Sequence, residues 1–260
     1  DARFEPVGDA LGLSGLSGTV SGDGGGFVFA PDPRSRVVVD WPSGFGAAHA
    51  FTLDGDLSGW RDADGWHVAT DGLAIAGDGL DLDVRGGLAW QGDGSRPRID
   101  LAAQVGEAPI TLAKGFWVRH RMAPAAVGWL DDALVGGTLH DGRTLIVGDL
   151  DDWPFRGTPA DPADGLFRAD VRIAGGTLRF HPGWPALEAM EASASFVGDG
   201  FQVGGSGAIA GVEVTRFDAA MERYGAGVLQ VDADGRGDAS QLLALLRESP
   251  LQATQGETLA

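Results

Sequence analysis

The fold is decided by residues 73–85, which read LAIAGDGLDLDVR. Within this stretch Gly77-Asp-Gly79 supplies the residues with positive φ that a tight hairpin turn requires. After the turn, apolar and charged residues alternate, with Leu80, Leu82 and Val84 on one side and Asp81, Asp83 and Arg85 on the other. A period of two places these two sets on opposite faces of a strand. The stretch therefore predicts an antiparallel hairpin with one apolar and one charged face.

The same unit recurs along the chain. Further copies of the strand, Gly-Asp or Asp-Gly turn and strand have their turns at residues 22–26, 62–65 and 198–200. Counting such stretches gives roughly fifteen or more strands of about five to seven residues, which side by side would run about 70 Å. A flat open sheet of that width is unusual, so the sheet should curve. We therefore expect a mainly β protein, in which a long, strongly curved antiparallel sheet of repeated hairpins forms an apolar groove.

Alternation also selects the side chains that would line the groove. The candidates are Phe27, Phe29, Val37, Val39, Leu80, Leu82, Val84, Leu101, Leu145, Val147, Val171, Ile173, Phe196, Val203 and Leu229. Their facing is inferred from alternation alone. A shift of one residue in register would move a strand's whole apolar set to the other face.

Two short helices interrupt the strand pattern. In residues 122–135 apolar side chains recur at helical spacing, Pro124 fits a first-turn position, and Gly136-Gly137 is expected to stop the helix. A second helix is expected over residues 238–248, capped by Asp238 or Ser240 and ended by Pro250. We expect both helices to seal part of the apolar face. The alternative is that one of them is a gate or a spacer in the groove.

Composition excludes several classes of function. The net charge is −18, with a single lysine, Lys114, so a basic face that neutralises nucleic-acid phosphates is not expected. There is no cysteine, and hence no disulfide or thiolate metal site. No apolar run approaches 18 residues, and the chain begins at Asp1 without a signal sequence. We therefore expect an interior piece of a longer protein, with any membrane anchor outside it.

No catalytic or metal-binding motif stands out. The five histidines are far apart, and none belongs to a metal-ligand spacing. Asp131 and Asp132 point about 100° apart on the expected helix, so they form a poor acid/base pair. Asp149, Asp151 and Asp152 lie in an expected loop, where acid/base work would require a raised pKa in one carboxyl. We predict that the chain is not an enzyme and uses no cofactor and no metal.

The stretch from Met122 onward carries a family resemblance. It contains Trp129-Leu-Asp-Asp-Ala-Leu134, then Val147-Gly-Asp-Leu-Asp-Asp-Trp-Pro-Phe155, Gly165-Leu-Phe167 and Pro182-Gly-Trp-Pro185. The tail adds Gly237-Asp-Ala-Ser-Gln-Leu-Leu243 and Ser249-Pro-Leu251. These motifs resemble the central region of the YhdP family, the large AsmA-like proteins of Gram-negative envelopes. The likeness covers about residues 115–251, whereas residues 1–114 match only in their β-repeat character.

The resemblance implies a periplasmic, repeating-β-groove body whose full-length protein is anchored in the inner membrane. It implies that phospholipid acyl chains are the cargo, carried between the inner and outer membranes for outer-membrane lipid homeostasis, and it brings no catalytic residues. The partners on the outer-membrane side are not specified. Trp153 and Trp184 are interpreted as corner residues that pack beside prolines. Direct contact of these two side chains with lipid is the alternative.

Two other functions share the same alternation. One is a structural β-scaffold with a dry core, and the other is a carbohydrate-binding β-repeat, which would need Trp60, Trp66 or Trp90 exposed along one face. The expected division of the chain is a β-hairpin repeat region at 1–114, a helical insert at 115–137, a β-groove region at 138–237, and a short helix with a tail at 238–260.

Overall fold

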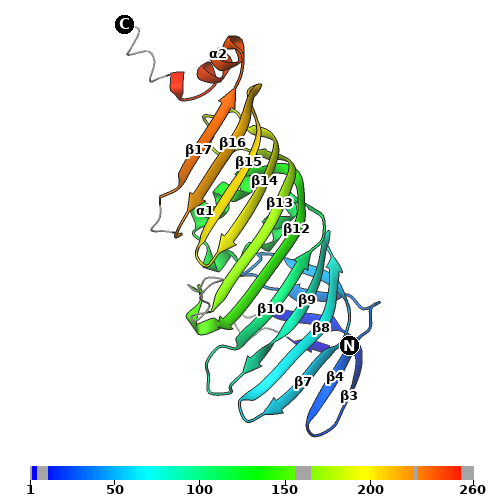
Figure 1. Cartoon of the computed structure of the whole chain (residues 1–260). Coiled ribbons are helices and arrows are strands. Elements are labelled where there is room, and N and C mark those ends of the chain that lie inside the picture. The colour runs from blue at the N-terminus through cyan, green and yellow to red at the C-terminus, as the bar shows by residue number, and fades with distance from the viewer. Residues whose placement is uncertain (1, 5–10, 156–164, 225–227, 253–260) are drawn as a thin grey trace.

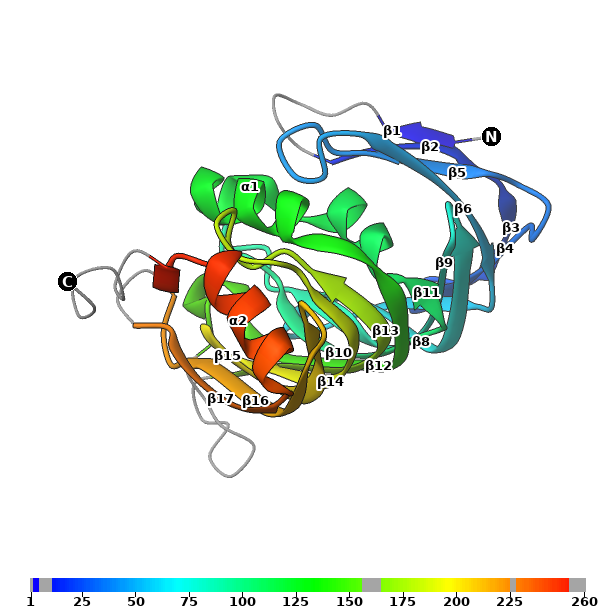
Figure 2. The same cartoon turned by 90° about the horizontal axis from the view of Figure 1, so that it is seen from above.

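A computed structural model describes residues 2–4, 11–155, 165–224 and 228–252 of the chain. These residues form one long, open antiparallel sheet with short helices, and the strands follow one another along the long axis of the molecule (Figure 1). Viewed along that axis, the sheet curves into a trough, with α1 on its hollow side (Figure 2). The predicted fold class, a strongly curved antiparallel sheet forming an apolar groove, is confirmed.

The N-terminal third divides into two branches that meet on one long strand, β8 (Gly65–Gly77). The strands of the branches are β1 (Ala2–Phe4), β2 (Gly12–Leu16), β3 (Gly18–Gly22), β4 (Gly26–Pro31), β5 (Val37–Asp40), β6 (Ala48–Asp54) and β7 (Leu57–Asp62). One branch runs β3-β4-β7 onto the first half of β8. The other runs β1-β2-β5-β6 onto its second half. Both branches therefore extend the same groove.

Longer strands build the rest of the sheet. They are β9 (Leu80–Trp90), β10 (Arg98–Val105), β12 (Leu134–Asp149), β13 (Leu166–Leu178), β14 (Leu187–Val197), β15 (Gly200–Ile209), β16 (Val212–Met221) and β17 (Gln230–Arg236). Each pairs with the next, while the short β11 (Ala108–Pro109) pairs with the first part of β12 beyond the end of β10. The four hairpin turns read from the sequence join β3 to β4, β7 to β8, β8 to β9, and β14 to β15, so these predictions are confirmed.

The predicted strand length of five to seven residues is wrong for these longer strands, since β12 has 16 residues and β13 has 13. The reason is a seam of bulges, where a strand bends and continues instead of ending. Register shifts interrupt the pairing of β8 with β9 between Thr70 and Leu73, and that of β12 with β13 between His140 and Arg143. Further shifts follow in the pairs from β13 to β17. This seam bends strands across their middle.

The helical segment lies between β11 and β12. It consists of two 3-10 turns, η1 (Ile110–Phe116) and η2 (Arg119–Arg121), and the helix α1 (Pro124–Ala133). The helix at 122–135 and the first-turn position of Pro124 are confirmed. The predicted stop at Gly136-Gly137 is wrong, because the chain turns extended at Leu134, which already pairs with Leu178 in the sheet. Sheet pairing ends this helix, and no glycine cap is needed.

The second predicted helix is α2 (Ala239–Arg247). Its N-cap is Asp238, whose carboxylate accepts the Gln241 N–H at 2.9 Å, while the Gln241 side chain accepts the Asp238 N–H at 2.8 Å. This reciprocal pair is a capping box, so the choice between Asp238 and Ser240 falls on Asp238. A third 3-10 turn, η3 (Leu150–Asp152), follows β12. None of the helices in the described ranges is both long and apolar enough to cross a membrane.

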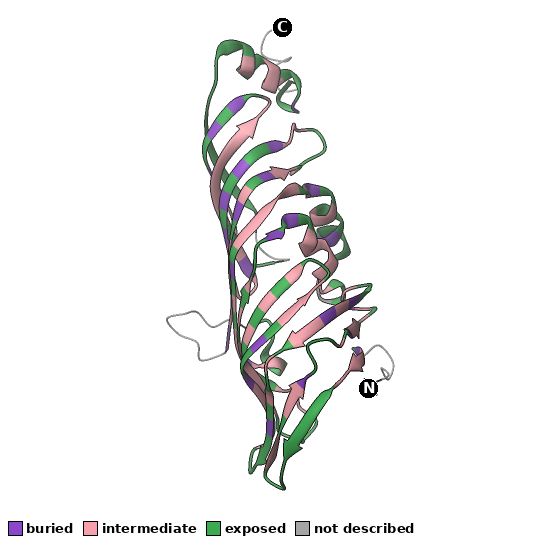
Figure 3. Ribbon diagram, turned by 90° about the vertical axis from the view of Figure 1, so that its right-hand side faces the viewer, coloured by how far each residue is buried: buried purple, intermediate pink, exposed green. Residues whose placement is uncertain are grey.

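Buried residues are spread thinly along the sheet instead of being gathered in one centre (Figure 3). The pairing of β10 with β12 carries the sheet past the helical segment without a break. The division of the chain at residues 114, 137 and 237 stays a prediction.

Candidate functional site

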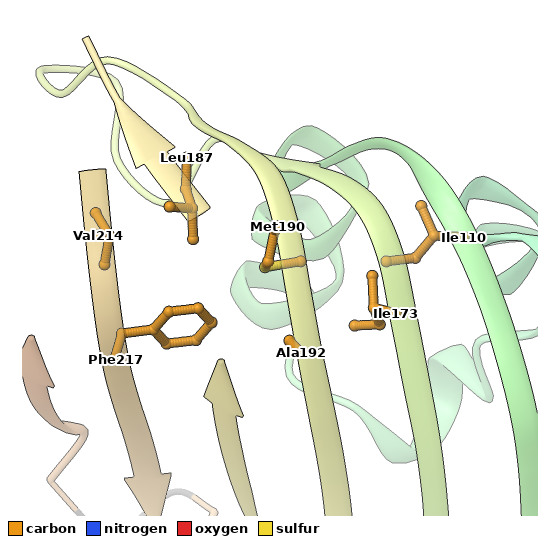
Figure 4. Close-up of a cluster of buried hydrophobic side chains, with 7 residues drawn as sticks. All are labelled: Ile110, Ile173, Leu187, Met190, Ala192, Val214 and Phe217. Carbon is orange, nitrogen blue, oxygen red and sulfur yellow. The ribbon is translucent and has the colours of Figure 1, made fainter. Parts of the chain in front are cut away.

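One contact identifies the hollow side of the sheet. Ile110 of η1 is 3% exposed and packs in a buried cluster with Ile173, Met190 and Phe217, as Figure 4 shows. The face that carries Ile173 is called the inner face below, and the opposite one the outer face. Residues paired directly across strands share a face, so the pairing registers extend this assignment over the sheet.

The inner face is continuous and apolar from the two N-terminal branches to β17. Ile173 is paired with Ala192, and Leu101 with Ile146, in register with Phe167 of β13. The following predicted groove residues lie on this face: Phe27, Phe29, Val37, Val39, Leu80, Leu82, Val84, Leu101, Val171, Ile173, Phe196 and Val203. Leu229 stands just before β17, two residues from the inner-face Val231, and is 46% exposed.

Leu145 and Val147 lie on the outer face, which corrects their placement beside Val171 and Ile173. They are paired with Arg168 and Leu166, whereas Ile146 is paired with the inner-face Phe167. The cause is the bulge at Asp141-Gly142, where two residues of β12 stand opposite one of β13 and Asp141 takes a φ of 52°. An extra residue inverts the facing of every residue after it.

Sequence alternation also missed several inner-face residues. Leu53 and Leu73 line the N-terminal part, and Ile146, Phe201 and Phe217 the C-terminal part. Phe201 was detectable, because it stands opposite Phe196 across the Gly198-Asp-Gly200 turn. Ile146 was not, because the phase of β12 depends on its bulge.

Most of the inner face is covered only partly. Val37 and Ile173 are buried, at 2% and 9% exposed, but Val20, Trp66 and Val231 on the same face are 66%, 50% and 61% exposed. In the part of the chain that the structure describes, all strands belong to one sheet, whose β1-β2-β5 branch arches over the hollow side (Figure 2). This branch and the helical segment supply the cover, and the rest forms an open apolar groove.

Aromatic contacts and hydrogen bonds tie the helical segment to the far side of the groove. Phe116 stacks on His49 of β6 with 4.5 Å between ring centroids, and His49 Nε2 lies 2.9 Å from the carbonyl oxygen of Gly115. The Arg119 N–H donates to the carbonyl of Gly44 at 3.0 Å. Because Ile110 packs on β13 at the other end, residues 110–121 hold together β6 and β13, two strands that are not neighbours. We call residues 110–133 the strap.

Charged side chains occupy the outer face. Arg168 pairs with Asp170 at 2.6 Å, Arg216 with Asp234 at 3.1 Å, and Arg172 with Asp141. The Arg168 guanidinium holds the pKa of Asp170 below its usual range, so this carboxyl stays ionised at neutral pH. Such exposed pairs add little stability. Their charged groups keep the outer face hydrated.

The carboxylates that the sequence offered as acid/base candidates have structural contacts. Asp131 accepts the Trp117 indole N–H at 3.0 Å, and its backbone carbonyl accepts Lys114 Nζ at 2.6 Å. Asp149 caps η3 by accepting the Asp151 N–H, and Asp151 lies 3.6 Å from Arg96. Among the described residues, no group of three or more histidine, aspartate or glutamate side chains is placed to hold a metal ion.

The two corner candidates, Trp153 and Trp184, pack against aromatic neighbours. Phe155 is completely buried, and the Trp153 ring contacts both Phe155 and Phe167 edge-on. Trp184 packs against Phe180, whose carbonyl accepts the Trp129 indole N–H at 2.9 Å. Trp153 is 37% exposed, so part of its ring remains open to a ligand.

A charged exterior and a continuous apolar interior define an elongated, open β-groove protein. The sequence pattern of the YhdP protein family matches residues 1–260, and the chain therefore belongs to the YhdP family. The chain is 25% identical over 191 residues to the Escherichia coli (strain K12) protein named "Intermembrane phospholipid transporter YhdP". The match covers 70% of this chain and 15% of that relative, so the chain spans only a small part of its length. No solved structure matches the chain.

Proposed function

We propose that this segment shields phospholipid acyl chains in its groove while lipid moves between the inner and outer membranes. The observation that carries the proposal is the continuous inner face, which the protein itself covers only in part. Hydrocarbon that covers such a face gains about 0.8 kcal/mol for each buried CH₂. The name of the Escherichia coli relative supplies the cargo class.

The proposal also covers the cellular location of the segment and its attachment to the membrane. The segment lies in the periplasm as one stretch of an envelope bridge, anchored in the inner membrane by a part of the protein outside this segment. The groove works without a cofactor and is not an enzyme. The pKa values of Asp62, Asp93, Asp170 and Asp238 all lie below their usual range, in the direction opposite to that needed by a general acid.

The scaffold alternative needs a sealed core, and the half-open inner face argues against it. The carbohydrate alternative needs tryptophans along one face. Trp66 and Trp90 are paired on the inner face, whereas Trp60 is paired with His67 on the outer face and stacks on its ring at 5.0 Å. The three rings therefore do not form one binding surface.

Lipid extraction tests the proposal directly. The chain is purified from a Gram-negative periplasm without detergent, and bound lipid is extracted and identified by mass spectrometry. We expect phospholipid in near-stoichiometric amount, and the same lipid class after the chain is incubated with phosphatidylethanolamine vesicles and separated from them. A folded chain that is free of lipid under both conditions would exclude the acyl-chain groove.

A further inference from the structure

The two long edges of the groove differ in how far the protein itself covers them. The C-terminal ends of β7, β9, β12, β14 and β16 lie along one edge, because neighbouring strands run antiparallel. Trp66, Trp90, Trp153, Phe167, Phe201 and Tyr224 lie at this edge, which we call the aromatic rim. The other edge, beside the strap, carries Leu80, Leu139, Leu178, Leu187 and Ile209, with Phe180 packed on the same cluster and Trp184 against Phe180.

The aromatic rim is open to solvent and carries polar groups. Trp66 and Trp90 stand directly opposite each other on β8 and β9 and are 50% and 38% exposed. The Arg61 guanidinium lies over the Trp66 ring, 5.9 Å from its centroid. At the far end of the rim Tyr224, 49% exposed, stacks on Phe201. Trp and Tyr have one apolar and one hydrogen-bonding end, which suits them to the level where hydrocarbon meets lipid headgroups.

The edge beside the strap is covered. Leu187 is 5% exposed and belongs to the cluster that Ile110 of the strap covers, together with Leu139, Leu178, Phe180 and Ile209. A phosphate at this edge would lose its water among apolar side chains under the strap, which is costly for a charged group.

The dimensions agree with one lipid lying across the groove. From Leu80 to Trp90, β9 runs about 33 Å at about 3.3 Å per residue. The acyl chains of one leaflet reach about 15 Å, half of the bilayer's apolar core of about 30 Å. Chains that start at the aromatic rim therefore end near the middle of the strands, beside Val84 and Leu101.

We infer that bound phospholipid has a fixed orientation, with its headgroup at the aromatic rim and its acyl chains directed toward the strap. This inference rests on the proposed function and adds to it the edge that the headgroups follow. Trp66, Trp90 and Arg61 form the headgroup-level contact in the N-terminal half, and Trp153 and Tyr224 in the C-terminal half.

Fluorescence quenching by spin-labelled lipids tests the orientation. The chain has no cysteine, so Leu88→Cys and Leu80→Cys each provide a single site for a bimane label. Both positions lie on the inner face of β9. Leu88 is two residues from Trp90, and Leu80 lies at the strap edge. The probes are phosphatidylcholine with a nitroxide on its headgroup and phosphatidylcholine with a nitroxide near the end of one acyl chain.

We expect the headgroup nitroxide to quench the label at Leu88→Cys strongly and the label at Leu80→Cys weakly. Equal quenching at both sites, or stronger quenching at Leu80→Cys, would overturn the orientation but leave the groove in place. Absence of quenching by either probe at either site would mean that no lipid binds, which overturns the proposed function as well.

A second measurement concerns the rings themselves. Trp66→Leu combined with Trp90→Leu keeps apolar side chains but removes both indoles, so we expect about three- to tenfold weaker phosphatidylcholine binding. The difference in quenching by the headgroup nitroxide between the two labelled sites should shrink in the same variant. Trp60→Leu, on the outer face of the adjacent strand, is the matched control and should leave both unchanged. A double variant with unchanged affinity and an unchanged difference in quenching would refute the role of the aromatic rim.

Discussion

Phe116 of η1 stacks on His49 of β6, with 4.5 Å between ring centroids and 27° between the ring planes. In the sheet, β8, β9 and β10 lie between β6 and β12, the strand against which η1 lies, so this contact links the strap to a distant strand. Together with the packing of Ile110 on Ile173 and Met190, it holds the strap across the groove.

Removal of the Phe116 ring should release one end of the strap. Phe116→Ala should lower the free energy of unfolding by about 2–3 kcal/mol, below the usual loss for a fully buried phenylalanine, because Phe116 is half-buried. Hydrogen exchange over residues 110–133 should accelerate more than that in β14 and β15. Thr111→Ala, at an exposed position of η1, should change stability by less than about 0.5 kcal/mol. Uniform acceleration over the whole sheet would contradict the strap as a separate unit.

The bulge of β8 between Thr70 and Leu73 lies against the bend between β6 and β7, and this close approach requires a glycine in the bend. Gly55 has a φ of 123°, and a Cβ there would lie 2.2 Å from the carbonyl oxygen of Gly72. Gly55→Ala should therefore destabilise the chain by about 2 kcal/mol or more, read from chemical denaturation. Gly24→Ala is the control, because a Cβ at Gly24 meets no atom within 4 Å. Similar stabilities of the two variants would show that the bend tolerates a side chain.

Facing on either side of the Asp141-Gly142 bulge can be tested with one pair of variants. Val171→Asp places a carboxylate on the inner face, and we expect at least about tenfold less co-purified phospholipid, because hydrocarbon does not solvate a charge. Leu145→Asp places the same group on the outer face opposite Arg168 and should leave lipid content unchanged. Circular dichroism and thermal melting check that both variants fold. Unfolding of Val171→Asp alone would instead assign this side chain to a sealed core.

The Asp238 carboxyl, which caps α2, should become protonated in acid, and the cap should then be lost. The Ser240 hydroxyl and the Gln241 N–H, which both donate to Asp238, hold the pKa of this carboxyl below its ordinary value of 3.8. Because the folded-state pKa is the lower one, the cap's contribution to stability is complete above pH 3.8 and is lost as the pH falls through the lowered pKa. The amide shift of Gln241, followed by NMR from about pH 6 to pH 2, should report this transition.

Asp238→Asn is the control for that titration, because asparagine caps a helix without ionising. Its Gln241 amide should show no transition of its own in the same range. A wild-type transition at or above pH 3.8 would mean that the cap does not stabilise the ionised carboxyl.

The sequence determined what depends on neighbouring residues. Alternation in Leu80, Leu82 and Val84 and the turn Gly77-Asp-Gly79 correctly predicted a hairpin and its apolar face, because strand facing and turn conformation are local properties. The same holds for the helix that begins at Pro124 and for the second helix, whose cap the sequence narrowed to Asp238 or Ser240 and the structure places at Asp238. These local features were sufficient for the fold class.

Only the tertiary structure decided the phase of β12, the path of the strap and the difference between the two edges. Leu145 and Val147 alternate as clearly as Val171 and Ile173, yet they face outward, because a bulge is fixed by pairing with another strand. Trp66 and Trp90 are 24 residues apart in the sequence and become partners only through the register of β8 and β9. Which side chains line the groove, and which lie at its rim, is therefore a property of the assembled sheet.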